Sequence, residues 1–234
     1  MENLSDKLET IIVETKSKKK KFIIFKKTLY PYKILKGTSY PLPKFIDPKI
    51  IIDVGANIGA ASFYFSETYP NSTIYAFEPA KDLIQILKKN LKTNNNVEII
   101  NKAVSNKNEK HSKFFIDYYN YDGSSLYKEY HQTNNLDLDK YEIVETIDLF
   151  NFCLENNIKK IDILKVDAEG SEFEIIETLI KNEVDIKLLY CESHNKKNYK
   201  KISELLKDSF NIKKDLIKNN ESHDTIYLSK KLNY

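Results

Sequence analysis

The stretch over residues 50–62 constrains the fold more than any other part of the chain. It begins with a short apolar run of β-branched residues, continues with Asp53, and then carries Gly55 and Gly59 before a series of small residues. This pattern is typical of a buried strand, a tight turn and the start of a helix. Glycine permits close backbone approaches that a Cβ would block. Because a helix start also presents unpaired N–H groups, we expect this turn to bind a ligand.

The residues after this turn alternate between strand and helix patterns. Strands are predicted over 49–54, 72–77, 97–101 (running on to 103–104), 113–119, 141–146, 160–166, 186–191, 210–216 and 225–229. Helices are predicted over 59–68, 82–92, 147–156, 172–181 and 199–209. This alternation is typical of an α/β, Rossmann-like fold, with a mostly parallel sheet and helices on both faces. We expect the last strand to be antiparallel.

The chain before about residue 46 differs from the rest. Residues 4–28 carry apolar positions that suggest a helix, interrupted by a basic run over 16–21, and residues 30–48 contain four prolines. We therefore predict a helical and proline-containing lead-in over residues 1–45, followed by one domain over 46–234. The basic run is interpreted as a solvated helix face, and contact with an acidic polysaccharide or a membrane surface is the alternative.

The composition fits a packed domain. Hydrophobic residues are 41%, charged residues are 30%, and the net charge is only +3, so we expect no nucleic-acid partner. No apolar run approaches the ~20 residues of a membrane span. The N-terminus lacks an apolar signal region, and Cys153 and Cys191 are far apart. We therefore expect a cytoplasmic protein with reduced thiols. Peripheral binding to the inner face of a membrane and the formation of a homo-oligomer are both left open.

Three ligand classes compete for the turn. A phosphate-cradling loop requires Gly-Lys-Ser/Thr, but two alanines follow Gly59. The dinucleotide fingerprint requires glycine two positions after Gly55, where Asn57 stands. S-adenosylmethionine carries an ammonium and a carboxylate but no phosphate. Asp53 can hold that ammonium directly or through water, and Glu78, at the end of the second strand, can accept both ribose hydroxyls.

At this point several motifs resemble the FkbM-type methyltransferases. They lie at residues 52–59, 77–79, 101–105, 123–126, 146–148 and 161–172, in the order of the family. The last block is the most specific, and residues 1–45 carry no part of the resemblance. The resemblance implies a seven-stranded class I methyltransferase fold. It also implies S-adenosylmethionine as cofactor and O-methylation, often of sugar hydroxyls in polysaccharides, glycolipids or natural products.

The expected cofactor site combines the first turn with the ends of the next two strands. Its residues are Asp53, Gly55, Ala56, Asn57, Gly59, Glu78, Pro79, Ala103 and Val104. Methyl transfer depends on in-line positioning, and an acceptor hydroxyl must also lose its proton. His194 is the leading general base, because an unperturbed histidine titrates near neutral pH. Asp167 and Glu169 are the rival bases, and Lys165 is expected to orient a strand-end acid.

The acceptor is expected to contact a tyrosine-rich connection and a later strand end. Tyr121, Ser124 and Ser125 suit sugar rings and hydroxyls, and Glu192 joins them. A divalent metal held by Glu192, His194 and nearby acids is the less favoured alternative, so no metal ligand is assigned. We expect a carbohydrate or glycoconjugate acceptor. The alternatives are a lipid, peptide or small-molecule acceptor, or a non-catalytic binding module in a glycan-assembly complex.

Overall fold

The computed structural model describes residues 4–15, 19–26, 28–41, 46–106, 109–117, 124–128, 137–218 and 222–232. Its centre is a seven-stranded sheet with the order β11-β12-β10-β9-β3-β4-β5. The strands are β3 (Ile50–Val54), β4 (Thr73–Phe77), β5 (Val97–Ile100), β9 (Lys160–Val166), β10 (Asp185–Ser193), β11 (Phe210–Lys218) and β12 (Ser222–Ser229). Only the ladders made by β12 are antiparallel. The predicted mostly parallel sheet and antiparallel last strand are therefore confirmed.

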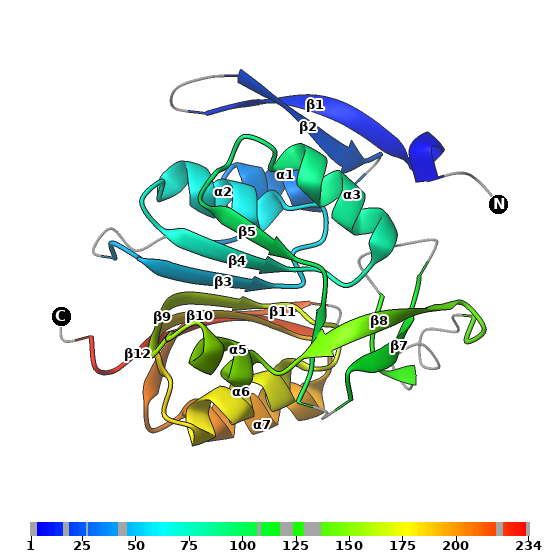
Figure 1. The fold of residues 1–234 in the computed structure, drawn as a ribbon. Coiled ribbons are helices and arrows are strands. Elements are labelled where there is room, and N and C mark those ends of the chain that lie inside the picture. Colours follow the sequence, from blue (N-terminus) through cyan, green and yellow to red (C-terminus); the bar gives the residue numbers. More distant parts are fainter. Residues whose placement is uncertain are drawn as a thin grey trace.

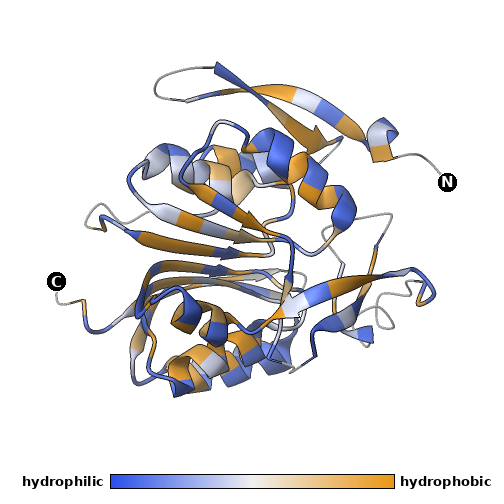
Figure 2. Ribbon diagram, viewed as in Figure 1, coloured by the Kyte–Doolittle hydropathy of each residue, from blue (hydrophilic) through white to orange (hydrophobic). Residues whose placement is uncertain are grey.

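Helices cover both faces of this sheet (Figure 1). One face carries α1 (Tyr30–Leu35), α2 (Ala60–Thr68) and α3 (Lys81–Asn90), and the other carries α5 (Leu149–Glu155), α6 (Glu172–Lys181) and α7 (Lys196–Leu206). The central strands are apolar along nearly their whole length because both of their faces are covered. The longer helices α3, α6 and α7 bury one side and present a hydrophilic outer side (Figure 2), whereas α2 is buried along most of its length.

The direction of sheet growth reverses between β3 and β9. From β3 the chain adds β4 and β5 on one side, and β9 and β10 extend the sheet on the other. Ligands of open α/β sheets bind outside the carboxyl ends of the strands at such a switch point. The two strand ends are joined here, because the N–H of Asp167 donates to the carbonyl of Val54 at 3.2 Å.

The N-terminal segment forms a β-hairpin, so the predicted helix is wrong. The short 3-10 helix η1 (Leu4–Lys7) precedes β1 (Leu8–Glu14), which pairs antiparallel with β2 (Lys19–Phe25). In β2 the buried residues Phe22 and Ile24 alternate with more exposed neighbours. This period of two belongs to a strand. The inward side chains of β2 must pack against another surface, and the hairpin does not provide one itself.

That partner surface is provided by α2 and α3. The ring of Phe22 packs edge-on against Phe63, with centroids 5.2 Å apart. Asn90 accepts from the N–H of Ile23 at 2.7 Å and donates back to the carbonyl of Ile23 at 2.9 Å. The hairpin therefore shares a hydrophobic cluster with the sheet domain. The division into a lead-in over 1–45 and a domain over 46–234 stays a prediction.

A smaller sheet flanks the domain. In it β8 (Tyr141–Ile147) pairs parallel with β6 (Ala103–Val104) and antiparallel with β7 (His111–Phe115). The predicted extension of the third strand therefore belongs to this second sheet. No helix in the described parts of the chain is long and apolar enough to cross a membrane.

Candidate active site

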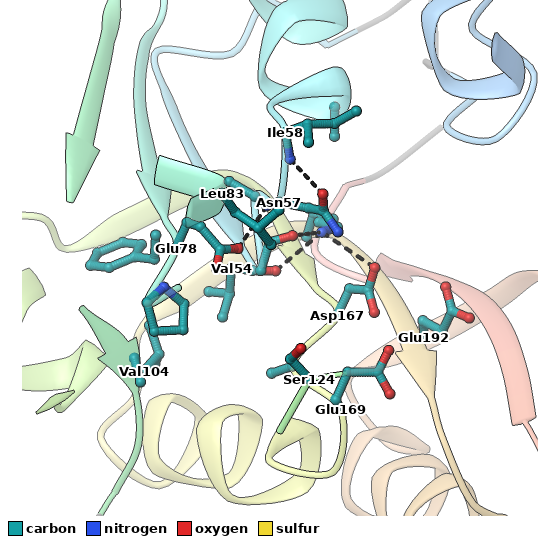
Figure 3. Close-up of a pocket in the computed structure, with 18 of the residues that line it drawn as sticks. Val54, Asn57, Ile58, Glu78, Leu83, Val104, Ser124, Asp167, Glu169 and Glu192 are labelled. Atoms are coloured by element: carbon teal, nitrogen blue, oxygen red, sulfur yellow. Dashed lines mark hydrogen bonds and ion pairs between the residues drawn. The ribbon is translucent and has the colours of Figure 1, made fainter. Parts of the chain in front are cut away.

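A cavity of about 230 Å³ lies at the carboxyl ends of β3, β4 and β9. In Figure 3, Glu78 and Val104 lie at one end of it and Asp167 and Glu192 at the other. Most of the predicted cofactor residues line it, namely Gly55, Ala56, Asn57, Glu78, Pro79, Ala103 and Val104. The sequence motifs thus converge on one cavity, which has an apolar end and an acidic end.

Both carboxylate oxygens of Glu78 are anchored by backbone. Oε2 accepts from the N–H of Asn57 and Oε1 accepts from the N–H of Ala80, each at 2.8 Å. Burial, which leaves only 4% of Glu78 exposed, raises the pKa of this carboxyl to about 7, although the two N–H groups oppose the shift. Each oxygen keeps a further lone pair, so the carboxylate can still accept two hydroxyls of a ligand.

Asn57 occupies the position where a dinucleotide fingerprint has its middle glycine. Its φ of 52° lies in the left-handed region, which asparagine tolerates better than most residues. The side-chain Oδ1 of Asn57 accepts from the N–H of Ile58 at 2.6 Å and closes the turn locally.

Gly55 and Gly59 have separate roles. A Cβ on Gly55 would lie 1.9 Å from the carbonyl oxygen of Asp167, so the turn packs directly on the end of β9. A Cβ on Gly59 would lie 2.6 Å from Leu87, so this glycine lets α2 approach α3. Gly59 is not among the described residues that line the cavity. Its predicted cofactor contact stays a prediction, whereas its contact with Leu87 gives it a role in helix packing.

Asp53 lies behind the turn instead of facing the cavity. It is fully buried, its Oδ2 accepts from the Ser62 hydroxyl at 2.6 Å, and its Oδ1 lies 3.2 Å from the Lys165 ammonium. The predicted contact of Asp53 with a cofactor ammonium, directly or through water, stays a prediction, and the structure shows this carboxylate enclosed and paired with Lys165.

Lys165 joins the two neighbouring strand ends. Besides its pair with Asp53, its Nζ lies 3.5 Å from Oδ2 of Asp167 and donates to the carbonyl of Gly55 at 2.6 Å. Burial disfavours the ammonium, but the two aspartates outweigh burial and raise the pKa of Lys165 above its ordinary value. The predicted pairing of Lys165 with a strand-end acid is confirmed.

His194 is enclosed by acids. Its Nδ1 lies 2.8 Å from Glu172, and its Nε2 lies 3.2 Å from Glu169, 3.6 Å from Asp167 and 3.7 Å from Glu192. Burial disfavours the charged ring, but Glu169 and Glu172 outweigh burial and raise the pKa of His194 well above its ordinary value. A protonated ring cannot accept a proton, and His194 is not among the described residues lining the cavity. The geometry points away from His194 as the base.

Three acids face the cavity and remain partly exposed. The exposed fractions of the side chains are 18% for Asp167, 12% for Glu169 and 17% for Glu192. Asp167, Glu192 and His194 each offer one ligand atom, and these atoms lie within 4.8 Å of one another. Carboxylate and imidazole ligands suit a divalent ion. His194 would first have to lose its ring proton.

The residues predicted to bind the acceptor have different surroundings in the structure. Ser124 lines the cavity, and its Oγ accepts from the N–H of Asp117 at 3.0 Å. Ser125 is fully buried, and its hydroxyl donates to the carbonyl of Glu169 at 2.5 Å. The predicted substrate contact of Ser125 stays a prediction, and in the structure its hydroxyl fixes the turn after β9. Tyr121 lies outside the described residues.

Two tyrosines of the N-terminal segment were missed. Tyr30 and Tyr40 both line the cavity, although their region was predicted to be a lead-in. The Tyr30 hydroxyl donates to Oε2 of Glu192 at 3.3 Å and lies 3.3 Å from the Tyr40 hydroxyl. The only local signal was that each tyrosine directly precedes a proline. Nothing local indicates that the two meet at a distant strand end.

The chain matches a family model, described as the methyltransferase FkbM domain, over residues 53–226. It is 30% identical over 154 residues to Methyltransferase 1 of Beauveria bassiana, covering 60% of this chain and 62% of that protein. It is 24% identical over 170 residues to the 2-O-methyltransferase NoeI of Sinorhizobium fredii, covering 65% of this chain and 66% of that protein. The chain thus spans less than two thirds of the length of these relatives.

The fold also has a solved counterpart. The fibrillarin pre-rRNA processing protein of Methanococcus jannaschii superposes with a TM-score of 0.52 at 14% identity, covering 95% of this chain and 83% of that one. This likeness confirms the predicted class I methyltransferase fold. The family model covers most of the chain and supports S-adenosylmethionine as the cofactor. This chain belongs to the FkbM methyltransferase domain family.

Proposed function

We propose that this chain is an S-adenosylmethionine-dependent O-methyltransferase that acts on a sugar hydroxyl of a surface polysaccharide, glycolipid or related glycan. The observation that carries the cofactor assignment is the anchored carboxylate of Glu78. Two backbone N–H groups fix its orientation inside the cavity. A carboxylate held in this way suits the two neighbouring hydroxyls of a ribose.

The rest of the cavity suits the other parts of the cofactor. Phe77, Leu83 and Val104 supply apolar surface beside Glu78 for an adenine ring. Glu169, at the opposite end, supplies negative charge for an ammonium. When bound, S-adenosylmethionine supplies an electrophilic methyl group.

We assign proton removal from the acceptor hydroxyl to Asp167. Its carboxylate lines the cavity next to Glu192, and Lys165 holds its Oδ2 at 3.5 Å. Burial raises the pKa of Asp167 above its ordinary value, Lys165 opposes the shift and Glu192 adds to it. A raised pKa makes this carboxylate a better proton acceptor than an ordinary aspartate. His194 then serves as the fixed cation that balances the surrounding acids.

An oxygen acceptor is supported by one relative, which is named a 2-O-methyltransferase. A sugar acceptor is supported by the hydroxyls and carboxylates at the acidic end of the cavity, which can exchange hydrogen bonds with several hydroxyls. A cytoplasmic location is supported by the two buried, unpaired cysteines, Cys153 and Cys191.

Calorimetric titration with S-adenosylmethionine tests the cofactor. Replacing Glu78 with Ala should weaken binding at least about tenfold, because hydrogen bonds to a charged acceptor contribute about 1.5–3 kcal/mol. Glu98→Ala, on the exposed side of β5, is the matched control and should bind normally. Absence of binding by the wild-type protein would remove the proposed enzyme. Mass spectrometry of glycans from cells with and without the protein then tests the acceptor, through the loss of one methyl increment.

A further inference from the structure

A second cavity, of about 400 Å³, adjoins the first one on the side of β10, β12 and β11. Five side chains line both cavities, namely Tyr30, Tyr40, Lys165, Asp167 and Glu192. The proposed base Asp167 therefore belongs to the wall between the cofactor cavity and a second, separate space. In methyl transfer the sulfur–carbon bond breaks as the oxygen–carbon bond forms, so donor and acceptor must approach the methyl carbon from opposite sides, and two adjoining cavities suit this requirement.

The roof of the second cavity comes from outside the region that matches the family model. Lys33, Thr38 and Ser39 line it from the segment before β3. This segment is fixed to the sheet, because the Tyr190 hydroxyl donates to the carbonyl of Pro41 at 2.7 Å. The Tyr40 ring also packs edge-on against Tyr190, with centroids 5.2 Å apart. The roof is thus a built part of the cavity.

The wall between the cavities is held by long hydrogen bonds. The Tyr30 hydroxyl lies 3.3 Å from both Glu192 and the Tyr40 hydroxyl. These distances exceed the usual 2.5–3.0 Å of hydroxyl hydrogen bonds, so each contact is weak. An incoming hydroxyl can donate to Glu192 and accept from the Tyr30 hydroxyl in its place at little cost, so Tyr30 would gain a hydrogen bond to the ligand. The wall can therefore admit a ligand hydroxyl toward Asp167.

The lining of the second cavity is charged but balanced. Its charged side chains are Lys33, Lys165, Lys214, Asp167, Glu192 and Asp224. Three cations thus face three anions, so the cavity does not select for a charged ligand. Thr38, Ser39 and Thr225 also line this cavity; the Thr38 hydroxyl donates to the carbonyl of Lys33 and the Thr225 hydroxyl to Asp215, so both keep lone pairs that can accept. Mixed donors and acceptors beside tyrosine rings suit a molecule that carries many hydroxyls, because each hydroxyl both donates and accepts.

We propose that the second cavity binds the methyl acceptor, that this acceptor is a neutral polyhydroxylated molecule of the glycoside type, and that Tyr30 and Tyr40 select the hydroxyl that reaches Asp167. This inference rests on the proposed O-methyltransferase function. It assigns acceptor selection to the N-terminal segment, whereas the matched domain holds the cofactor.

The test uses the full chain, methyl-labelled S-adenosylmethionine and a panel of probes. The probes are neutral methyl hexosides, with the matching hexose phosphates and methyl uronates as charged counterparts. Lys214→Met and Tyr30→Phe alter the second cavity. Lys213→Met, on the exposed neighbour in β11, and Tyr32→Phe, in α1 but outside both described cavity linings, are the matched controls.

We expect the wild-type protein to methylate neutral hexosides in preference to their charged counterparts. Lys214→Met and Tyr30→Phe should raise the KM for the hexoside about fivefold or more, the effect of losing one hydrogen bond. The Kd for S-adenosylhomocysteine should stay within about twofold in Lys214→Met and in both controls, because none of these three side chains lines the cofactor cavity. The two controls should keep the wild-type KM.

Three results would overturn the inference, and they can be told apart. Preference for hexose phosphates or uronates, or turnover of no hexoside by a protein that binds the cofactor, would refute a neutral glycoside. Turnover of hexosides with an unchanged KM in Lys214→Met and Tyr30→Phe would refute the acceptor cavity alone. Failure of the wild-type protein to bind S-adenosylmethionine would refute the proposed function itself.

Discussion

The backbone N–H of Asn57 donates to Oε2 of Glu78 at 2.8 Å and joins the first turn of the sheet to the end of the neighbouring strand. Burial raises the pKa of this carboxyl to about 7, near the pH at which the protein is expected to work, although the contact with Asn57 opposes the shift. A carboxylate accepts two ribose hydroxyls, whereas its protonated form loses one acceptor site. Cofactor affinity should therefore be coupled to pH through this one side chain.

The first prediction is that cofactor binding strengthens as pH rises through 7. The ionised fraction of Glu78 increases about tenfold between pH 6 and pH 8, so the Kd should fall about tenfold over that range. Calorimetry with S-adenosylhomocysteine at several pH values measures this slope. In Glu78→Gln the side chain cannot ionise, so binding should be weaker and the slope should flatten. A slope that persists in Glu78→Gln would assign the titration to another group.

The second prediction concerns Lys165. Replacing it with Met leaves Asp53 buried without its cation, which should cost about 3–5 kcal/mol in the free energy of unfolding. Lys159→Met, in the exposed turn before β9, is the control and should change stability by less than about 0.5 kcal/mol. Urea denaturation measures both values. Adding Asp53→Asn to Lys165→Met should recover part of the loss, and a double variant no better than the single one would contradict the pairing.

The central sheet was predictable because its signals are local. The strand over 160–166 and the helix over 172–181 were predicted with the bounds that the structure has. Both are apolar patterns bounded by charged or small residues. The hairpin of β1 and β2 was missed for a physical reason. Phe22 and Ile24 alternate inward only because α2 and α3 cover them, and that surface exists only after the domain has folded.

The candidate site divides in the same way. The cofactor half depends on one turn and on strand ends, so residues such as Gly55 and Glu78 could be selected from motifs alone. Asp53 and Gly59 lie outside the cavity because of how the turn packs against β9 and α3. The spacing of residues in the sequence does not specify that packing. Tyr30 and Tyr40 reach Glu192 only through tertiary packing, which the motifs do not reveal.

The third prediction separates two glycines that share a positive φ. Gly55 has a φ of 74° and Gly170 a φ of 113°, so alanine is strained at both positions. A Cβ on Gly55 also meets the Asp167 carbonyl at 1.9 Å, whereas a Cβ on Gly170 lies 3.4 Å from the Tyr127 ring. Gly55→Ala should therefore lower the free energy of unfolding by at least about 2 kcal/mol more than Gly170→Ala. Equal losses would mean that backbone strain, and not the contact with β9, makes Gly55 necessary.

The fourth prediction concerns the pair formed by His194 and Glu172. The pKa of His194 is raised, so its contribution to stability is fully present below 6.5 and is lost only as pH rises through its higher folded value. Burial opposes the charge of Glu172, but His194 and the N–H of Gly170 outweigh burial and lower the pKa of Glu172. Its contribution is present above 4.5 and is lost as pH falls through its folded value.

His194→Gln should therefore lose about 3 kcal/mol of unfolding free energy, because it leaves the fully buried Glu172 without its cation. The loss should be largest at pH 5 and smaller at pH 8, because the unfolded chain gives up the His194 proton above about 6.5 while the folded protein still holds it. Urea denaturation at both pH values measures it. The exposed His111→Gln is the control and should change stability by less than about 0.5 kcal/mol. A loss that vanishes by pH 8 would show that His194 titrates near neutral pH, and it would restore His194 as a general base in place of Asp167.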